Sequence, residues 1–170
     1  NNMAGAALRV LGIAFKPLDH EMINPTPNII ERDMIFAGLL AMMDPPRPEV
    51  KDAVATCHDA GITTVMITGD HKNTARAIGE ELGFLCDNSK AIDGVELDAL
   101  SNDALEKEVS KIAVYARVSA EHKLRIVKAW KKQGAAVAMT GDGVNDAPAV
   151  KEASIGVSMG ITGTDVTKEA

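Results

Sequence analysis

Short apolar runs alternate with helical stretches along most of the chain, and this alternation limits the fold more than any other feature of the sequence. The runs are Ile62–Ile67, Ile112–Ala116, Ala135–Met139 and Ser154–Met159. They are apolar throughout instead of alternating with polar residues, which is typical of strands buried on both faces. The pattern therefore predicts an α/β fold, a parallel sheet with helices on both faces.

Helix start and stop signals support the same fold. Helices are expected over Glu49–Asp59, His71–Leu82, Ser101–Val109 and Ser119–Gln133. Pro48 suits a first helical turn, Ser119 is a favourable N-cap, and Gly83 ends a helix. Met34–Leu40 is predicted to be a further buried strand, and the weakly patterned residues 87–100 a hairpin or loop.

The composition excludes some classes of function. The 170 residues carry a net charge of −6 and only 3% aromatic side chains, so nucleic-acid binding is not expected. No signal peptide is recognisable, and Met34–Met43 is about half as long as a membrane span requires. Cys57 and Cys86 are expected to be reduced, buried thiols. The chain itself is expected to be soluble.

The loop at residues 140–146, Thr-Gly-Asp-Gly-Val-Asn-Asp, is the most informative local sequence. It follows a predicted strand and places two carboxylates, Asp142 and Asp146, four residues apart around a glycine turn. Crowded carboxylates repel each other, and Mg²⁺ is a common solution to that repulsion. Asn145 adds an amide oxygen. The alternative interpretation is an ordinary turn in which Asp142 caps the following helix.

Two further features point to phosphate. Thr68, Gly69 and Asp70 follow another predicted strand and offer a hydroxyl and backbone N–H groups at a helix N-terminus, where anions bind well. Lys123 lies in the first turn of its helix, where the helix dipole disfavours a cation unless it faces an anion. A simple N-cap turn and a solvated surface lysine are the respective alternatives.

A hydroxyl, a lysine and a paired-acid loop, in this order at successive strand ends, resemble the haloacid dehalogenase superfamily. Such a layout positions a phosphoryl group and neutralises its charge. The superfamily's nucleophilic aspartate, in Asp-Lys-Thr-Gly-Thr or Asp-x-Asp-x-Thr, is missing from this sequence. Asp44 ends an earlier strand but precedes Pro45-Pro46, so it is rejected as the nucleophile.

The sequence also resembles the P-type ATPases, specifically type II cation pumps of the calcium-ATPase kind. The resemblance rests on Asp44-Pro45-Pro46-Arg47, Thr68-Gly69-Asp70, Ala116 to Lys123, Thr140 to Pro148 and Met159 to Val166. It implies that residues 1–33 are the end of a nucleotide-binding domain with its linker. Residues 34–170 would then be an incomplete phosphorylation domain, a haloacid-dehalogenase-like Rossmannoid sheet without its first, nucleophile-bearing strand.

The resemblance assigns roles to individual residues. Asp142 matches the Mg²⁺ ligand, and Asp146 and Asn145 match supports of the phosphate site. The catalytic group would comprise Lys123, which neutralises the transferred phosphoryl, together with Asp146 and Thr68. The residues implied in binding ATP are Arg9, Asp44, Thr68, Gly69, Asp70, Arg117, Lys123 and Asn145, with Arg47 beside Asp44 in a hinge near the ribose.

The function implied is that of the cytoplasmic catalytic segment of an ATP-driven cation pump, with calcium as the expected ion. Its partners would be Mg²⁺, ATP, and the remaining domains and membrane helices of the parent pump. The missing strand would lie between those ending at Thr68 and Thr140. The gap would remain open or be closed by re-pairing or self-association, since unpaired strand edges invite another strand.

Two other functions remain as alternatives. A stand-alone phosphatase of the same superfamily would need an Asp-x-Asp-x-Thr strand, which residues 1–43 do not contain. A module that binds Mg²⁺ or a nucleotide without chemistry would need no nucleophile. The isolated chain is expected to be inactive in phosphorylation, because the attacking aspartate is absent from its sequence.

Overall fold

The computed structural model describes residues 8–17, 26–42, 45–86, 88–161 and 163–169. The chain divides into two compact units, Asn1–Pro45 and Pro46–Ala170. This division falls twelve residues beyond the domain boundary expected after residue 33. The assignment of the segments on either side to nucleotide-binding and phosphorylation domains stays a prediction.

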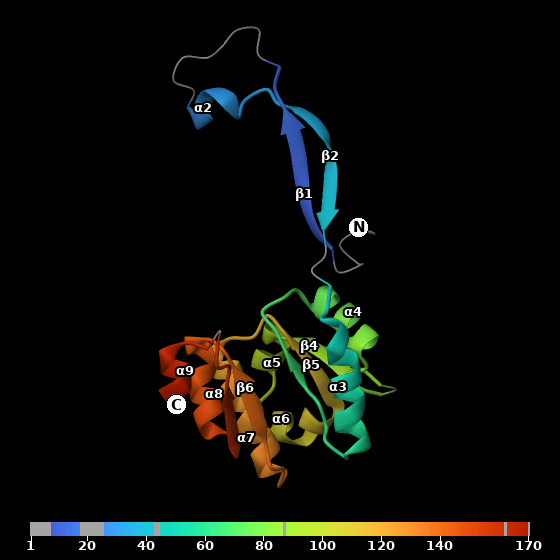
Figure 1. Ribbon diagram of the computed structural model, residues 1–170, viewed down its shortest axis with the longest axis vertical. Helices are drawn as coiled ribbons and strands as arrows, with labels where there is room; N and C mark the ends of the chain where they lie inside the picture. Colours follow the sequence, from blue (N-terminus) through green and yellow to red (C-terminus); the bar gives the residue numbers. More distant parts are fainter. Residues whose placement is uncertain (1–7, 18–25, 43–44, 87, 162, 170) are drawn as a thin grey trace. The chain divides into compact units, whose positions relative to one another are not determined.

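The first unit contains a two-stranded antiparallel hairpin (Figure 1). Strand β1 (Arg9–Phe15) pairs with β2 (Ile35–Met42), and the short helix α2 (Pro27–Ile30) precedes β2. The prediction of a buried strand at Met34–Leu40 is wrong in its burial, because Phe36 is 65% exposed and most of β2 is uncovered. A two-stranded ribbon has no second layer against which to bury these side chains.

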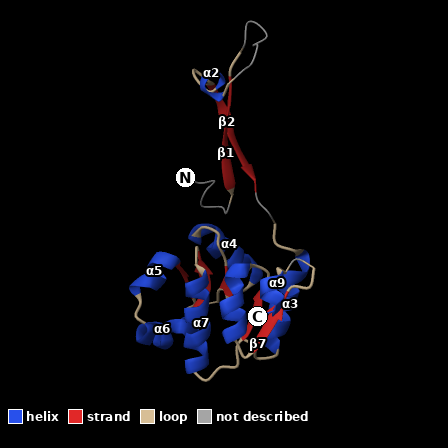
Figure 2. Ribbon diagram, turned by 90° about the vertical axis from the view of Figure 1, so that its left-hand side faces the viewer, coloured by secondary structure: helices blue, strands red, loops and turns tan. Residues whose placement is uncertain are grey.

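The second unit is an α/β structure with its strands inside and its helices outside (Figures 1 and 2). Its strands are β3 (Met66–Ile67), β4 (Lys90–Asp93), β5 (Ile112–Ala116), β6 (Ala138–Gly141) and β7 (Ile155–Ser158). Its helices are α3 (Pro48–Asp59), α4 (Lys72–Leu82), α5 (Gly94–Ala99), α6 (Asn102–Glu108), α7 (Ala120–Lys132), α8 (Ala147–Glu152) and α9 (Asp165–Glu169), with 3₁₀ turns η1 (Val109–Lys111) and η2 (Val144–Asp146).

Strand β5 is the centre of a parallel three-stranded sheet in the order β3-β5-β4. Val114 and Ala116 pack with Ala75 of α4, whereas Tyr115 belongs to a cluster with residues of α6 and α7. All three β5 side chains have 0% exposure. Successive residues of a strand point to opposite faces, so this division places helices on both sides of the sheet, as the unbroken apolar run predicts.

Strands β6 and β7 form a separate parallel pair. Among the described residues no ladder joins β3 to β6, so the predicted gap lies between the strands that lead to Thr68 and Thr140. A largely apolar groove of about 470 Å³ runs along this gap. Residues of β3 and its approach, α7, β6 and β7 line it, including Ile62, Ile67, Trp130, Val137 and Ile155.

Two local predictions need correction. Residues 87–100 hold strand β4 and helix α5 instead of a hairpin or loop. A capping box fixes the start of α5, because the Asp93 carboxylate accepts from the Glu96 N–H and the Glu96 carboxylate from the Asp93 N–H. The strand expected over Ile62–Ile67 is shorter, since only Met66 and Ile67 pair with β5.

The helix signals are confirmed at several positions. Helix α3 begins at Pro48, Ser119 caps α7, and Gly83 ends α4 in the left-handed conformation with φ +83°. His71, expected as the first residue of α4, is instead its N-cap. None of the helices in the described ranges has the length and apolar content needed to cross a bilayer. Cys57 is partly buried and Cys86 exposed, so the expectation that both are buried is wrong.

Candidate functional site

A buried ion pair joins the start of α7 to the loop after β6. Lys123 Nζ lies 2.5 Å from Asp146 Oδ1, and the two side chains are 19% and 9% exposed. Ser119 and His122 form the capping box at the start of α7 and so fix the turn that carries Lys123. The sequence expectation that Lys123 faces an anion is therefore met by a carboxylate of the same chain.

Asp146 is held in its ionised form. Burial raises the pKa of its carboxyl. The pKa is lowered by a larger amount by hydrogen bonds from Lys123 and from the N–H groups of Gly143 and Asp142, together with the attraction of the lysine charge. The net result is a pKa below the ordinary value of 3.8. The Asp146 carboxylate therefore stays ionised at neutral pH, although it is largely removed from water.

Asp146 also shapes the turn that precedes it. Its Oδ2 accepts hydrogen bonds from the N–H groups of Asp142 and Gly143, at 3.2 and 3.0 Å. Gly141 is buried against it, and a Cβ at this glycine would collide with the Asp146 side chain. Asp142 is exposed, so it is the carboxylate of the pair that remains open to a ligand.

These groups converge on a cleft of about 340 Å³ at the carboxyl end of β6. Ligands of open parallel sheets bind at this edge. The cleft is lined by Val65, Ile67, Lys123, Asp142, Asp146, Met159 and residues 138–141. Ile67 is the residue immediately before Thr68, so the first Thr-Gly-Asp turn begins beside the cleft without lining it.

The turn formed by Thr68, Gly69 and Asp70 is hydrogen-bonded both within itself and to the end of β5. The Thr68 hydroxyl donates to Asp70 Oδ2 at 3.1 Å and accepts from the Asp70 N–H at 3.1 Å. The Arg117 N–H donates to the Asp70 carbonyl at 3.1 Å, which ties the end of β5 to this turn. Arg117 has φ +48°, a strained conformation for a residue with a side chain. The predicted residues 68–70 and Arg117 are thus brought together.

Other predicted residues are not assembled in the cleft. Asn145 is exposed and does not line it. Arg47 is the exposed N-cap of α3. Arg9 begins β1 in the other unit, and its side chain is not described. Asp44 lies outside the described residues.

The sequence analysis missed an anchor behind Lys123. His122 Nε2 lies 2.7 Å from Asp98 Oδ1, and Arg125 donates to the carbonyls of Leu97 and Leu100, at 3.3 and 2.7 Å. These contacts fasten the start of α7 to α5. The Asp93-x-x-Glu96 spacing of a capping box could have revealed α5, and with it the position of Asp98.

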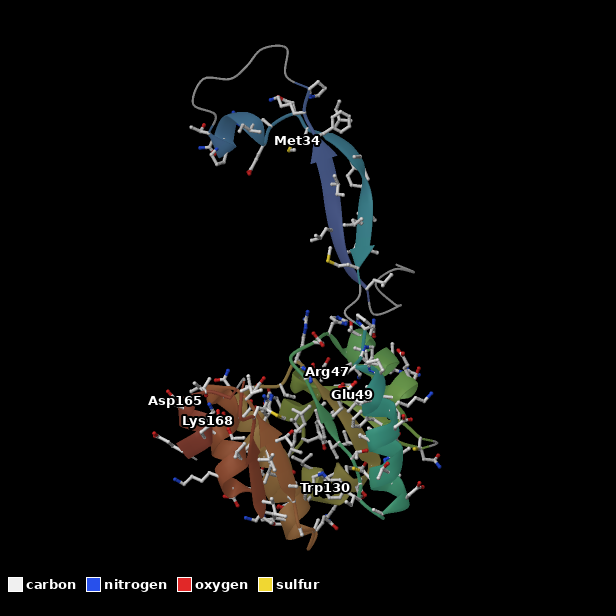
Figure 3. The ribbon with its side chains drawn as sticks, viewed as in Figure 1. Met34, Arg47, Glu49, Trp130, Asp165 and Lys168 are labelled. Carbon is white, nitrogen blue, oxygen red and sulfur yellow. The ribbon has the colours of Figure 1, made fainter. Side chains whose placement is uncertain are left out.

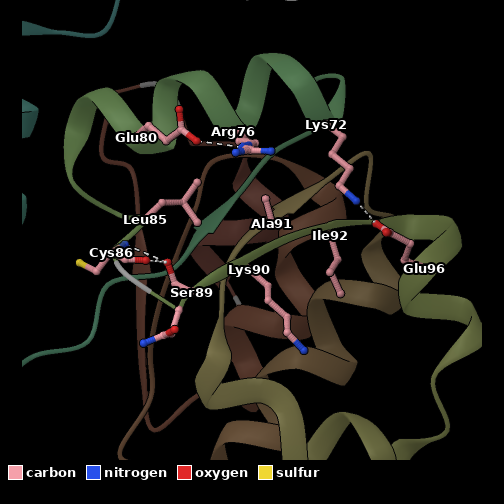
Figure 4. A pocket seen from close by; sticks show the side chains of 11 residues that line it. Lys72, Arg76, Glu80, Leu85, Cys86, Ser89, Lys90, Ala91, Ile92 and Glu96 are labelled. Atoms are coloured by element: carbon pink, nitrogen blue, oxygen red, sulfur yellow. Dashed lines mark hydrogen bonds and ion pairs between the residues drawn. The ribbon is translucent and has the colours of Figure 1, made fainter.

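A larger hollow of about 920 Å³ lies beside β4 (Figure 4). Size alone would select it as the site, yet none of the candidate catalytic, nucleotide-binding or metal residues lines it. Three cations line it, and each is paired with a carboxylate: Lys72 with Glu96, Arg76 with Glu80 and Lys90 with Glu108. With its charges already compensated, this hollow has little attraction for an anion.

The cleft offers one exposed carboxylate, that of Asp142, to a metal ion. The described residues contain no group of three His, Cys, Asp or Glu side chains able to hold an ion. Mg²⁺ does not require such a cage, because it keeps several waters and uses one or two carboxylates together with substrate phosphates. Asp142 therefore fits Mg²⁺ shared with a phosphate, and does not fit a closed structural metal site.

Comparison with known proteins agrees with the fold. A family model for haloacid dehalogenase-like hydrolases matches residues 8–154. The chain is 53% identical over 171 residues to the calcium-transporting ATPase of Bacillus subtilis, and 46% identical over 172 residues to calcium-transporting ATPase 1 of Saccharomyces cerevisiae. These alignments cover 99% and 100% of this chain, but only 19% and 18% of the relatives.

A third relative is the probable cation-transporting ATPase F of Mycobacterium tuberculosis, 52% identical over 147 residues, which are 84% of this chain and 16% of the relative. The chain belongs to the haloacid dehalogenase-like hydrolase family. The sequence resemblance to calcium-ATPase-like pumps is confirmed by these relatives, of which the chain spans about a fifth of the length.

Proposed function

We propose that this chain is the phosphoryl-handling segment of an ATP-driven cation pump, with calcium as the transported ion. One structural observation carries the proposal: Lys123, Asp142 and Asp146 converge on a single cleft at the carboxyl end of β6. The printed names of the relatives support the choice of calcium. The cleft is suited to positioning and charge neutralisation, which make up most of phosphoryl-transfer catalysis.

Each residue of the cleft has a distinct task in this proposal. Asp142 would hold Mg²⁺, which when bound offsets the negative charge of the phosphate oxygens. Lys123 places its ammonium group beside the transferred phosphoryl. Asp146 holds both, through its ion pair with Lys123 and its hydrogen bonds to the turn that carries Asp142.

The ATP side of the proposal rests on the first turn and its neighbours. Thr68 and Gly69 would supply hydroxyl and N–H donors to the terminal phosphate, and Arg117 a charge beside them. Arg9, Asp44, Asp70 and Asn145 are proposed nucleotide contacts by family resemblance. Asp70 and Asn145 do not line the cleft, so their contacts would require ATP and further parts of the protein.

The gap between β3 and β6 supports a proposal about partners. Two strand edges border an apolar groove, which suits an extended segment from another part of the parent pump. Such a strand would bring the attacking aspartate to Lys123 and Asp142. The parent would also supply the membrane helices, with this segment on the cytoplasmic side.

The isolated chain could instead cover the gap with a second copy. Light scattering distinguishes the two states: self-association gives a dimer mass that rises with protein concentration. A monomer at all concentrations, with the β3 and β6 edges open to amide exchange, would contradict self-association. It would leave the proposed pumping function untouched.

The function is tested in the full-length pump that contains this segment. Asp142→Asn should weaken Mg²⁺-dependent formation of the phosphoenzyme, because the open carboxylate is lost. Unchanged phosphoenzyme levels across a Mg²⁺ titration would contradict Asp142 as the ligand. A matched control is Asp59→Asn, an exposed acid on α3 that does not line the cleft.

A second test uses the 170-residue chain alone. With Mg²⁺ and ATP it should not become phosphorylated, because it lacks the Asp-Lys-Thr-Gly-Thr sequence. An acid-stable, hydroxylamine-sensitive label on the chain would contradict this. Binding of Mg²⁺ without such a label would describe the isolated chain as a binding module.

A further inference from the structure

The turn at Asp142 and Gly143 is hydrogen-bonded at all four of its backbone polar groups. Asp146 Oδ2 accepts from both N–H groups. The Asp142 carbonyl accepts from the Thr164 N–H at 2.9 Å, and the Gly143 carbonyl accepts from both the Asp146 N–H at 2.9 Å and the Thr167 hydroxyl at 2.8 Å. The peptide units therefore cannot rotate without breaking a bond, and the Asp142 side chain is left as the open group.

Thr167 is unusual in its burial. It is 2% exposed, and among the described residues the buried polar or charged side chains are Thr167 and Asp146. Both of them bond the same two-residue turn, one at its carbonyl side and the other at its N–H side. The Thr167 hydroxyl also lies 2.8 Å from the Thr164 hydroxyl, which completes its hydrogen bonding.

These threonines come from the far end of the chain. Thr167 lies in α9, 24 residues beyond the glycine whose carbonyl it bonds. The outer face of α9 is charged, with Asp165 and Lys168 exposed (Figure 3). A helix of five residues is not stable alone, so α9 depends on its contacts with the loop and α8. The contact between Thr167 and the Gly143 carbonyl therefore orders both α9 and the Asp142–Gly143 turn.

We propose that Thr167 is a positioning residue for the Mg²⁺ site: its hydroxyl latches the Asp142–Gly143 turn in the geometry that presents the Asp142 carboxylate. The proposal rests on the proposed function of Asp142. Because linkage is reciprocal, Mg²⁺ bound at Asp142 also stabilises the docking of α9. The segment that follows β7 is thereby coupled to occupancy of the cleft.

The test uses three variants of the 170-residue chain. Thr167→Val removes the hydroxyl and keeps the shape, Thr167→Ala removes both, and Thr167→Ser keeps the hydroxyl. Thr56→Val is the matched control, because the Thr56 hydroxyl also donates to a backbone carbonyl, that of Asp52, but does so on α3. Circular dichroism and thermal unfolding check that each variant keeps the α/β unit.

Two readouts are needed. The first is hydrogen exchange at the amides of Asp142 and Gly143 and along α9, without metal. Thr167→Val and Thr167→Ala should speed this exchange, and Thr167→Ser and Thr56→Val should not. The second is a titration with Mg²⁺ alone, followed by NMR. Loss of the hydroxyl should weaken Mg²⁺ binding about 10-fold, as removal of supporting hydrogen bonds does at other metal sites.

The outcomes separate this inference from the proposed function. If the wild-type chain shows no Mg²⁺-dependent chemical shifts, Asp142 is not a metal ligand and Thr167 has no role in positioning a metal. Faster hydrogen exchange in Thr167→Val would in that case still show that the Thr167 hydroxyl latches the turn. If wild type binds Mg²⁺ and Thr167→Val binds it equally well, the positioning role is wrong. Unchanged exchange in both Thr167→Val and Thr167→Ala would overturn the latch itself.

Discussion

The chain contains the tripeptide Thr-Gly-Asp twice, at residues 68–70 directly after β3 and at residues 140–142 at the end of β6. In the first copy, Thr68 and Asp70 share two hydrogen bonds, and the Thr68 N–H and the Asp70 carbonyl bond the backbone of Tyr115 and Arg117. In the second copy, the Asp142 N–H donates to the Asp146 carboxylate, and the Asp142 carbonyl accepts from the Thr164 N–H just before α9. The carboxylate of the first copy is thus bonded within its own turn, whereas that of the second is exposed on a turn bonded to a buried carboxylate.

This difference suits two different tasks. A metal ligand needs a fixed carboxylate, and the second copy leaves Asp142 as an exposed side chain on a turn bonded to the buried Asp146 carboxylate. A loop that closes over a bound phosphate gains from bonds that can be exchanged, and the two side-chain bonds of the first copy are exposed. Rigidity here comes from long-range contacts, so the tripeptide alone does not determine the role.

The largest expected effect is on the ion pair that locks the second copy. Lys123→Met should destabilise the chain by about 3 kcal/mol, because it leaves the Asp146 carboxylate buried without its cation. The free energy of unfolding from urea titrations at pH 7 measures it.

The control for this variant is Lys72→Met at the more exposed pair of Lys72 and Glu96, 31% and 48% exposed. It should cost less than about 1 kcal/mol, as surface ion pairs do. Equal losses of unfolding free energy in the two variants would show that burial does not make the Lys123–Asp146 pair more important for stability.

The matched glycines give the sharpest contrast between the copies. Gly141→Ala should cost about 2 kcal/mol, because its Cβ collides with Asp146 and approaches Val150 Cγ2 at 3.0 Å. Gly69→Ala should change the free energy of unfolding by about 0.5 kcal/mol or less, since nothing lies within 4 Å of its added Cβ. Equal tolerance at both glycines in thermal unfolding would show that the second turn is not locked.

Low pH should destabilise the second Thr-Gly-Asp turn more than the first. The pKa of Asp146 is lower in the folded chain than its ordinary 3.8, so the ionised carboxylate stabilises the fold above that pH. This contribution is lost as the pH falls through the folded pKa. The stability difference between wild type and Asp146→Asn should therefore be constant from pH 7 to 5 and shrink below about pH 4. A difference that persists unchanged at pH 2.5 would contradict the assignment.

The smallest effect is expected at the hydroxyl of the first copy. Thr68→Val removes two exposed hydrogen bonds within one turn, and should lower the free energy of unfolding by about 0.5 kcal/mol. Chemical denaturation measures the change. A loss above about 2 kcal/mol would mean that Thr68 supports more than its own turn, and would remove the contrast with the second copy.

Local signals in the sequence account for much of the fold. The apolar run of β5 predicts burial on both faces, and Ser119 predicts the start of α7. The gap beside β3 follows from the family resemblance and agrees with the strand order. Of the site, Lys123, Asp142 and Asp146 could be predicted from the sequence. Each lies in the loop or helix start that follows a predicted strand, and each carries a charge suited to a phosphate or a metal ion.

Features that depend on long-range contacts could not be predicted. The apolar residues of β2 predict burial, but exposure depends on whether a second layer is present, and among the described residues none covers the hairpin. Strand β4 has four residues, too few for a periodic pattern. Thr167 is one of several threonines near the end of the chain, and its importance arises solely from the carbonyl it meets 24 residues away.

The most direct test of the central claim is a titration of the chain with Mg²⁺, followed by amide chemical shifts in wild type, Asp142→Asn and Asp70→Asn. The locked turn should bind the metal: shifts at residues 141–146 should saturate in wild type and Asp70→Asn and disappear in Asp142→Asn. Saturating shifts at residues 68–70 that depend on Asp70, or shifts at residues 141–146 that survive Asp142→Asn, would contradict it.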